Sequence, residues 1–68
     1  MKNWTLLYAT QNLSEASIIK GMLEENSVPV LLVNKQDSSY VFIGDIELYV
    51  PNLLKEVARS LVDQGMMN

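Results

Sequence analysis

The sequence contains neither cysteine nor histidine among its 68 residues. The lack of cysteine excludes disulfide bonds and thiolate metal sites, and the lack of histidine removes the commonest metal ligand and general base. Five lysine and arginine residues against eight aspartate and glutamate residues give a net charge of −3. Because phosphate groups are bound by clustered positive charge, this balance disfavours nucleic acid as a partner. We expect a protein that is not an enzyme and holds no metal or cofactor.

Long apolar runs are also missing from the sequence. No stretch approaches the length of a membrane-spanning helix, and the apolar run near the N-terminus is too short for the core of a signal peptide. We therefore expect a cytoplasmic protein, without a membrane partner, that forms one domain over residues 1–68. A chain of this length builds only a thin core, and with disulfides excluded, oligomerisation is the route left open to stabilise it.

An amphipathic helix followed directly by a strand is the clearest pattern that the chain does contain. Asn12 is a good N-cap, and the carboxylate of Glu15 is placed to accept from the backbone N–H of that cap. Asn26 suits the left-handed conformation of a helix C-cap, and Pro29 prevents the helix from continuing. The β-branched and aliphatic residues 28–33 then predict a strand. The apolar face of the helix comprises Ala16, Ile19, Met22 and Leu23.

Two further strands flank this unit. Residues 4–9 are aromatic and aliphatic, which predicts the first strand. Residues 40–50 predict the third, interrupted at Gly44-Asp45 by either a bulge or a tight turn. The polar residues 34–39 are expected to form a hairpin loop between the second and third strands.

A second amphipathic helix closes the chain. Pro51 ends the third strand, Asn52 is expected to cap the helix, and Gly65 is a natural place for it to stop. Its apolar stripe follows helical spacing and comprises Leu54, Val57, Ala58, Leu61 and Val62.

The predicted order is therefore strand, helix, strand, strand, helix. Each helix has a single apolar stripe, so both should cover the same face of one sheet. A right-handed crossover through the first helix leaves a gap between the first two strands, and the third strand fills it in antiparallel pairing. This predicts an α+β fold, a two-layer ferredoxin-like sandwich of β-α-β-β-α order without the usual last strand. Residues 46–50 would form the middle strand.

The chain has more apolar side chains than one covered face requires. If Leu7 and its alternate neighbours pack beneath the helices, Trp4, Leu6 and Tyr8 emerge on the uncovered face, together with Tyr49. A contiguous apolar patch of this kind marks an interaction surface. Two alternatives stay open: loops or the C-terminal tail fold over the patch, or the register is reversed and every side chain changes face.

Other chemistry is weaker in the sequence. Aromatic residues on an open sheet, here Trp4, Tyr8 and Tyr49, resemble the stacking platform of RNA-binding sheets, but no basic residues lie among them. Asp45 and Glu47 are two apart on a strand, which suits a weak divalent-cation site, although two carboxylates supply few of the ligands that calcium takes. A solvated edge is the favoured interpretation of this pair.

Several segments together resemble a known family. They are Trp4 with Leu7-Tyr8, the run KGMLEENSVPV at 20–30, and IELYVP at 46–51. They are similar to the small prokaryotic signal-transducing domains of unknown function that are grouped with the PII-like, ferredoxin-like fold. The resemblance implies a bacterial regulatory module. PII regulators use a long loop to contact targets and nucleotide, whereas the loop at 34–39 is short and has no glycine-rich phosphate cradle, so no nucleotide site is carried over.

These patterns predict a non-enzymatic binding or regulatory module. We expect it to self-associate, with a homodimer favoured, or to bind a protein partner through its open sheet face or the free edge of its first strand. The predicted interface residues are Trp4, Leu6, Tyr8 and Tyr49. The alternative is a small-molecule sensor with a pocket between sheet and helices or at a dimer seam.

Overall fold

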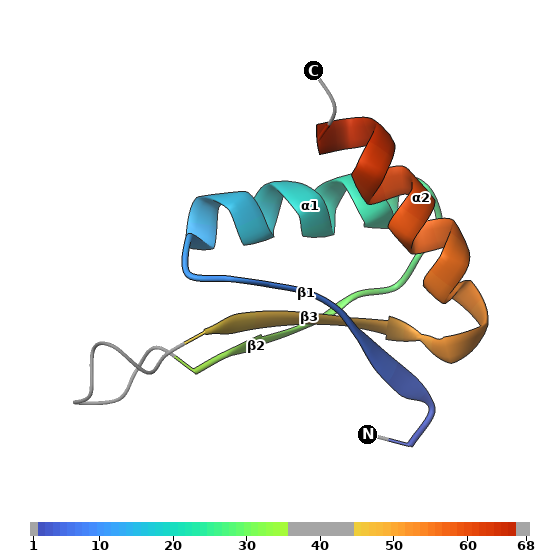
Figure 1. Cartoon of the computed structure of the whole chain (residues 1–68), viewed down its shortest axis with the longest axis horizontal. Coiled ribbons are helices and arrows are strands. Elements are labelled where there is room, and N and C mark those ends of the chain that lie inside the picture. The colour runs from blue at the N-terminus through green and yellow to red at the C-terminus, as the bar shows by residue number, and fades with distance from the viewer. Residues whose placement is uncertain (1, 36–44, 67–68) are drawn as a thin grey trace.

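A computed structural model describes residues 2–35 and 45–66 of the chain (Figure 1). The predicted strand segment 40–43, Gly44 and the greater part of the predicted loop 34–39 lie outside the described residues. The elements in chain order are β1 (Trp4–Thr10), α1 (Leu13–Glu25), β2 (Leu31–Asn34), β3 (Ile46–Pro51), the 3-10 turn η1 (Asn52–Leu54) and α2 (Lys55–Met66).

The described strands form one sheet in the order β1-β3-β2, and β3 pairs antiparallel with both neighbours. Both helices lie on one side of this sheet, with α2 at a steep angle to α1 (Figure 1). The predicted α+β sandwich, with residues 46–50 in the middle strand, is confirmed. The backbone N–H of Lys35 donates to the carbonyl of Asp45 at 3.0 Å, which continues the β2–β3 pairing beyond the two strands.

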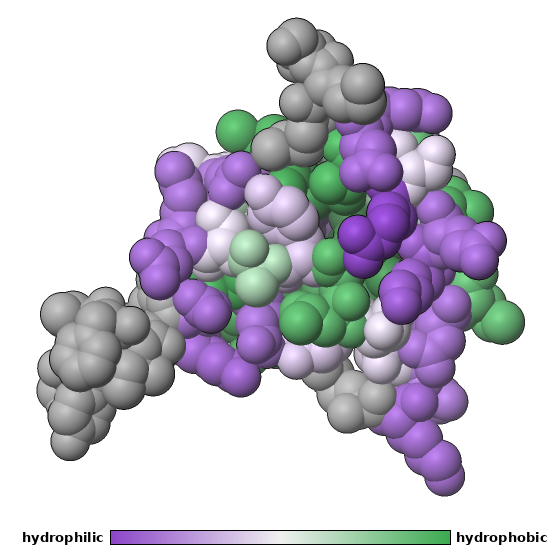
Figure 2. Space-filling view, viewed as in Figure 1, coloured by the Kyte–Doolittle hydropathy of each residue, from purple (hydrophilic) through white to green (hydrophobic). Residues whose placement is uncertain are grey.

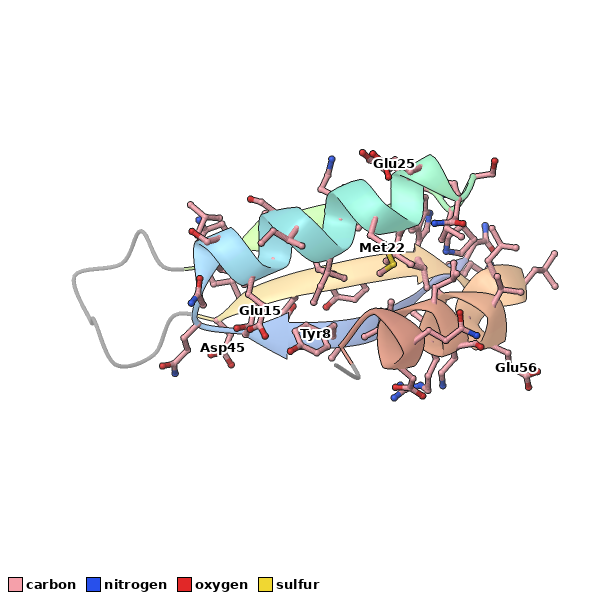
Figure 3. The ribbon with its side chains drawn as sticks, turned by 90° about the horizontal axis from the view of Figure 1, so that it is seen from above. Tyr8, Glu15, Met22, Glu25, Asp45 and Glu56 are labelled. Atoms are coloured by element: carbon pink, nitrogen blue, oxygen red, sulfur yellow. The ribbon has the colours of Figure 1, made fainter. Side chains whose placement is uncertain are left out.

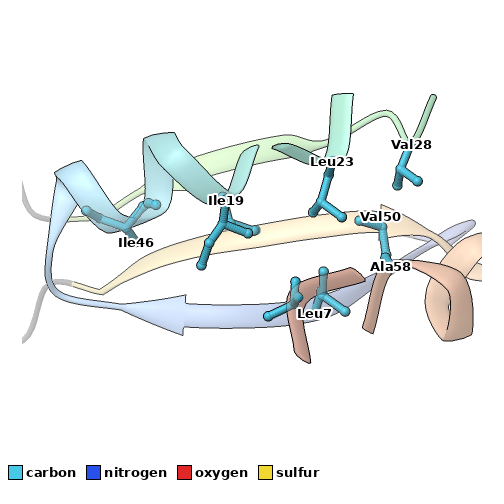
Figure 4. Packing of buried hydrophobic residues seen from close by; sticks show 10 residues of the cluster. Leu7, Ile19, Leu23, Val28, Ile46, Val50 and Ala58 are labelled. Carbon is cyan, nitrogen blue, oxygen red and sulfur yellow. The ribbon is translucent and has the colours of Figure 1, made fainter. Parts of the chain in front are cut away.

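The core lies between the sheet and the two helices (Figure 4). α1 buries Ala16, Ile19 and Leu23 completely or nearly so, and the strictly alternating β3 buries three side chains on the same side. Full burial of an aliphatic side chain contributes about 1.5–3 kcal/mol, so this layer supplies most of the stability of the fold. Among the described residues, the buried hydrophobic ones are Leu7, Ala16, Ile19, Leu23, Val28, Ile46, Leu48, Val50, Ala58 and Val62.

The N-terminus of α1 is capped by Asn12 as predicted, but the Glu15 carboxylate is linked to the cap through Thr10 and not directly. The Glu15 backbone N–H donates to Asn12 Oδ1 at 3.0 Å, which confirms the N-cap. The prediction that the Asn12 N–H donates to the Glu15 carboxylate is wrong. Instead the Asn12 N–H donates to Thr10 Oγ1 at 3.1 Å, and the Thr10 hydroxyl donates to Glu15 Oε1 at 2.6 Å. The Thr10 hydroxyl lies between the Asn12 N–H and the Glu15 carboxylate because β1 ends at Thr10, just before the cap.

The C-terminus of α1 differs from the prediction by one residue. Asn26 has φ −102°, and Ser27 takes the left-handed conformation with φ 67°. The Ser27 N–H donates to the Glu24 carbonyl, and the Val28 N–H donates to the Leu23 carbonyl at 2.9 Å. This is the Schellman arrangement, in which Val28 and Leu23 also pack together as its hydrophobic contact. The need to bury Val28 therefore places the left-handed residue at Ser27.

The entry to α2 also departs from the prediction. Asn52 begins η1 without capping it, because its Nδ2 donates to the Lys2 carbonyl at 3.4 Å and its backbone N–H donates to the Asn3 carbonyl at 3.0 Å. These bonds join the start of η1 to the residues before β1. At the other end α2 continues through Gly65 to Met66, so the predicted stop at Gly65 is wrong by one residue.

Candidate functional site

The sheet face turned away from the helices is the candidate site, and the strand register determines which side chains lie on it. Residues directly opposite one another in a ladder share a face. Glu47, Tyr49 and Pro51 alternate with the three buried residues of β3, so they and their partners face away from the helices. We call this surface the open face; in the described strands it comprises Trp4, Leu6, Ala9, Leu31, Val33, Glu47, Tyr49 and Pro51.

Trp4, Leu6 and Tyr49 lie on the open face as predicted, but Tyr8 does not. A bulge shifts the β1–β3 register between Leu6 and Tyr8, with Leu7 as the extra residue. Leu7 points into the core, and Tyr8 lies opposite the buried Leu48, on the helix side. The period-two pattern of the sequence gives no sign of the extra residue, and the bulge changes the face of every side chain after it.

Tyr8 has a role on the covered side that joins β1 to α1. Its hydroxyl donates to Glu15 Oε2 at 3.0 Å, while Thr10 donates to the other carboxylate oxygen (Figure 3). The hydrogen bond to Glu15, together with burial and the negative charge nearby, raises the pKa of Tyr8 above its usual value of 10.0. Tyr8 therefore lies on the helix side of the sheet, and its predicted place on the uncovered face is incorrect.

Glu47 is the only carboxylate among the open-face residues, and its charge is satisfied within the chain. Tyr49 donates its hydroxyl to Glu47 Oε1 at 2.7 Å, and the Lys35 ammonium lies 3.3 Å from the same oxygen. These two contacts, the Tyr49 hydrogen bond first, hold the pKa of Glu47 below its usual value, and the same bond raises the pKa of Tyr49. The Glu47 side chain is only 17% exposed.

The rest of the open face is apolar and partly accessible. Leu6 and Leu31 are 44% and 41% exposed. Leu31 and Val33 were not among the predicted interface residues, although the signal was present: residues 30–33 are all apolar, and a strand covered on one side cannot bury both faces. The face therefore presents hydrocarbon around one neutralised ion pair.

A hollow of about 350 Å³ lies at one end of the sheet, lined by Asn3, Pro51, Asn52 and Leu53. It lies where β3 passes into η1, away from the space between sheet and helices in which the sensor alternative places its pocket. The space between the layers is occupied by side chains such as Ile19, Leu23 and Leu48, which are at most 1% exposed.

The remaining candidate groups are not brought together. Asp45 Oδ1 accepts a long hydrogen bond from Gln11 Nε2 at 3.5 Å, whereas Glu47 binds Tyr49 and Lys35, so the two carboxylates have different partners. In residues 2–35 and 45–66 there is no group of three or more potential metal ligands. No helix in the described part of the chain is long and apolar enough to cross a membrane.

The two tyrosine–carboxylate bonds predict an alkaline titration in the folded protein. Tyrosine is neutral when protonated, so a raised pKa means that the folded state holds the proton more tightly than the unfolded state. The resulting stabilisation is present below the unfolded pKa of 10.0 and is lost as the pH rises through the folded values. In a Tyr40→Phe background, the ultraviolet titration of Tyr8 and Tyr49 should have midpoints above 10.0 and return to it in urea. Midpoints at or below the urea value would contradict both hydrogen bonds.

Comparison with known protein families gives a match over nearly the whole chain. The model of a family described as "Putative prokaryotic signal transducing protein" matches residues 4–65, nearly the whole chain. A search of the curated proteins and a search of the solved structures found nothing that matches. The matched region spans every described strand, α1 and all of α2 except Met66. The resemblance predicted from the sequence is confirmed, and the chain belongs to this family.

Proposed function

We propose that this chain is a non-enzymatic signal-transducing module that pairs with a second copy of itself through the open face. The observation that carries the proposal is the composition of that face. It is apolar around Leu6 and Leu31, and its one carboxylate, Glu47, already has two partners. The desolvation cost of burying such a surface is small because it has no unpaired charge, and the burial of its apolar side chains is favourable.

A second copy suits this surface better than a charged partner. In a two-fold pair each patch meets an identical patch, so an unpaired charge near the axis would meet its own like charge. Lys35 neutralises Glu47 within each copy, which removes that repulsion. The open face can therefore meet a copy of itself without charge repulsion, while it offers a charged partner no unpaired carboxylate to attract.

The face is favoured over the strand edges as the surface of contact. The bulge at Leu7 interrupts the regular pairing of β1, and β2 is only four residues long. Bulges and short strands are features that protect sheet edges from pairing with another chain. A three-stranded face about six residues long covers roughly 300 Å² in projection. That is small compared with stable interfaces of about 800 Å² per partner, so we expect a weak, reversible dimer.

Sedimentation over protein concentrations from about 1 μM to about 1 mM tests the proposal. We expect the wild-type chain to shift from monomer to dimer within this range, and Leu31→Asp to weaken the dimer at least tenfold, because it places a carboxylate at the apolar contact. Ile18→Asp is the matched control, since Ile18 is 71% exposed on α1, away from the sheet. A wild-type chain that stays monomeric, or an equal effect of both variants, would reject pairing through the open face.

A further inference from the structure

An exposed leucine stands beside the hollow at the end of the sheet. Leu53 lies in η1 with 96% of its surface exposed, and Val57, four residues later, is 51% exposed. Figure 2 shows apolar surface projecting at the end of the molecule where Figure 1 places the turn from β3 into α2, with hydrophilic surface around it. Isolated exposed leucines are common, but this one forms a wall of a hollow of about 350 Å³.

Two hydrogen bonds from Asn52 to backbone carbonyls hold the other walls of the hollow in place. Asn52 donates its backbone N–H to the Asn3 carbonyl at 3.0 Å and its Nδ2 to the Lys2 carbonyl at 3.4 Å. Pro51 precedes it with its ring-restricted φ of −58°. The hollow therefore exists before anything binds, and little ordering is required when it is filled.

The unpaired positive charge of the described chain is carried by the segments around this hollow. Lys20 pairs with Glu24 and Lys35 pairs with Glu47. Within residues 2–35 and 45–66, the exposed Lys2, Lys55 and Arg59 form no ion pair. Lys2 adjoins the wall residue Asn3, and the other two lie in the first turns of α2.

The segments that line or adjoin the hollow have the opposite net charge to the chain as a whole. Three cations and the single carboxylate of Glu56 leave +2 on residues 2–3 and 51–59, whereas the whole chain carries −3. Glu15 and Asp45 lie at the other end of the sheet from Glu56 (Figure 3). We call residues 2–3 and 51–59, with the hollow and Leu53, the basic corner.

We propose that the basic corner binds an acidic peptide segment of another protein, which inserts one apolar side chain into the hollow against Leu53. The local charge attracts carboxylates on either side of that apolar residue. The side chain of Asn3, exposed at the rim, can bond the amide groups of an extended peptide. A second copy fits less well, because in a two-fold pair the basic corner would meet another basic corner of the same charge. This inference does not depend on pairing through the open face.

Selection from a displayed library of random dodecapeptides on the immobilised chain tests the proposal. We expect the enriched peptides to carry aspartate or glutamate around one aliphatic or aromatic residue. A synthetic peptide from this set should bind at least about tenfold more weakly to Leu53→Ser, because the apolar contact is lost, and its affinity should fall several-fold as salt is raised. Lys55→Glu should weaken it by about tenfold through charge reversal.

The controls are the same substitutions at distant positions. Leu13→Ser, at a leucine 51% exposed at the start of α1, and Lys20→Glu, on the exposed side of the same helix, should leave the peptide affinity unchanged. Leu31→Asp should also leave it unchanged, which separates this site from the open face. Far-UV circular dichroism checks that each variant is folded.

The following results would contradict binding of an acidic peptide at the basic corner. Enrichment of no peptides, or of basic or uncharged peptides, would overturn the proposal, as would equal peptide binding by Leu53→Ser and the wild-type chain. If Leu53→Ser instead abolishes self-association in sedimentation, the corner is occupied by a second copy and the peptide assignment is wrong.

Discussion

Leu48→Ala is expected to lower the free energy of unfolding by about 3 kcal/mol, the largest single effect that we predict. Leu48 is fully buried in the middle strand, between Tyr8 on β1 and Leu32 on β2. The substitution removes three carbon atoms and leaves a cavity that strands paired on both sides cannot close. For a domain of this size the total stability is about 5 kcal/mol, so the melting temperature should fall by about 15 °C. Urea and thermal unfolding measure both quantities.

Leu53→Ala is the matched control for this prediction. It makes the same chemical change at a leucine that is 96% exposed instead of fully buried. We expect its effect to stay within about 0.5 kcal/mol, as for other surface substitutions. Similar losses at the two positions would mean that β3 is not the centre of the core.

Glu15→Ala is expected to cost about 2 kcal/mol, the second-largest effect. The Glu15 carboxylate accepts hydrogen bonds from the hydroxyls of both Tyr8 and Thr10, and Thr10 in turn accepts the Asn12 N–H. Its loss leaves these hydroxyls without their acceptor and removes negative charge from the first turn of α1, where the helix dipole favours it. The melting temperature should fall by about 10 °C.

Two variants distinguish this network from a general effect of charge. Glu25→Ala removes a carboxylate from the exposed last turn of the same helix, where negative charge is unfavourable, and should change stability by less than about 0.5 kcal/mol. Tyr8→Phe removes one of the two hydroxyl donors and should cost about 1 kcal/mol. If Glu15→Ala proves no more harmful than Glu25→Ala, the link between β1 and α1 does not stabilise the fold.

The two proposed surfaces give a small module two separate contacts. Pro51 belongs to both, because it lies opposite Trp4 on the open face and lines the hollow of the basic corner. A signal-transducing module needs one surface that recognises a partner and another that responds. The open face, whose one carboxylate is neutralised by Lys35, is suited to a second copy of the chain, and the basic corner to an acidic segment of another protein.

Local patterns in the sequence determined the secondary structure and the order of the strands. The helical spacing of apolar residues in α1 and the alternation in β3 each indicate a single buried face, and Asn12 is recognisable as an N-cap from its residue type alone. The handedness of the crossover then places β3 between β1 and β2, because no other order fills the gap. These features depend on near neighbours along the chain, so they can be inferred without tertiary contacts.

The position of single side chains was decided only in the tertiary structure. The bulge at Leu7 follows from the fit of β1 against β3, and it moves Tyr8 from the open face to Glu15. Ser27 takes the left-handed position where Val28 reaches the core, and the start of η1, which carries the exposed Leu53, is joined to Asn3 through the backbone N–H of Asn52. In each case the deciding contact joins groups held in place by packing, and a periodic pattern carries no information about that fit.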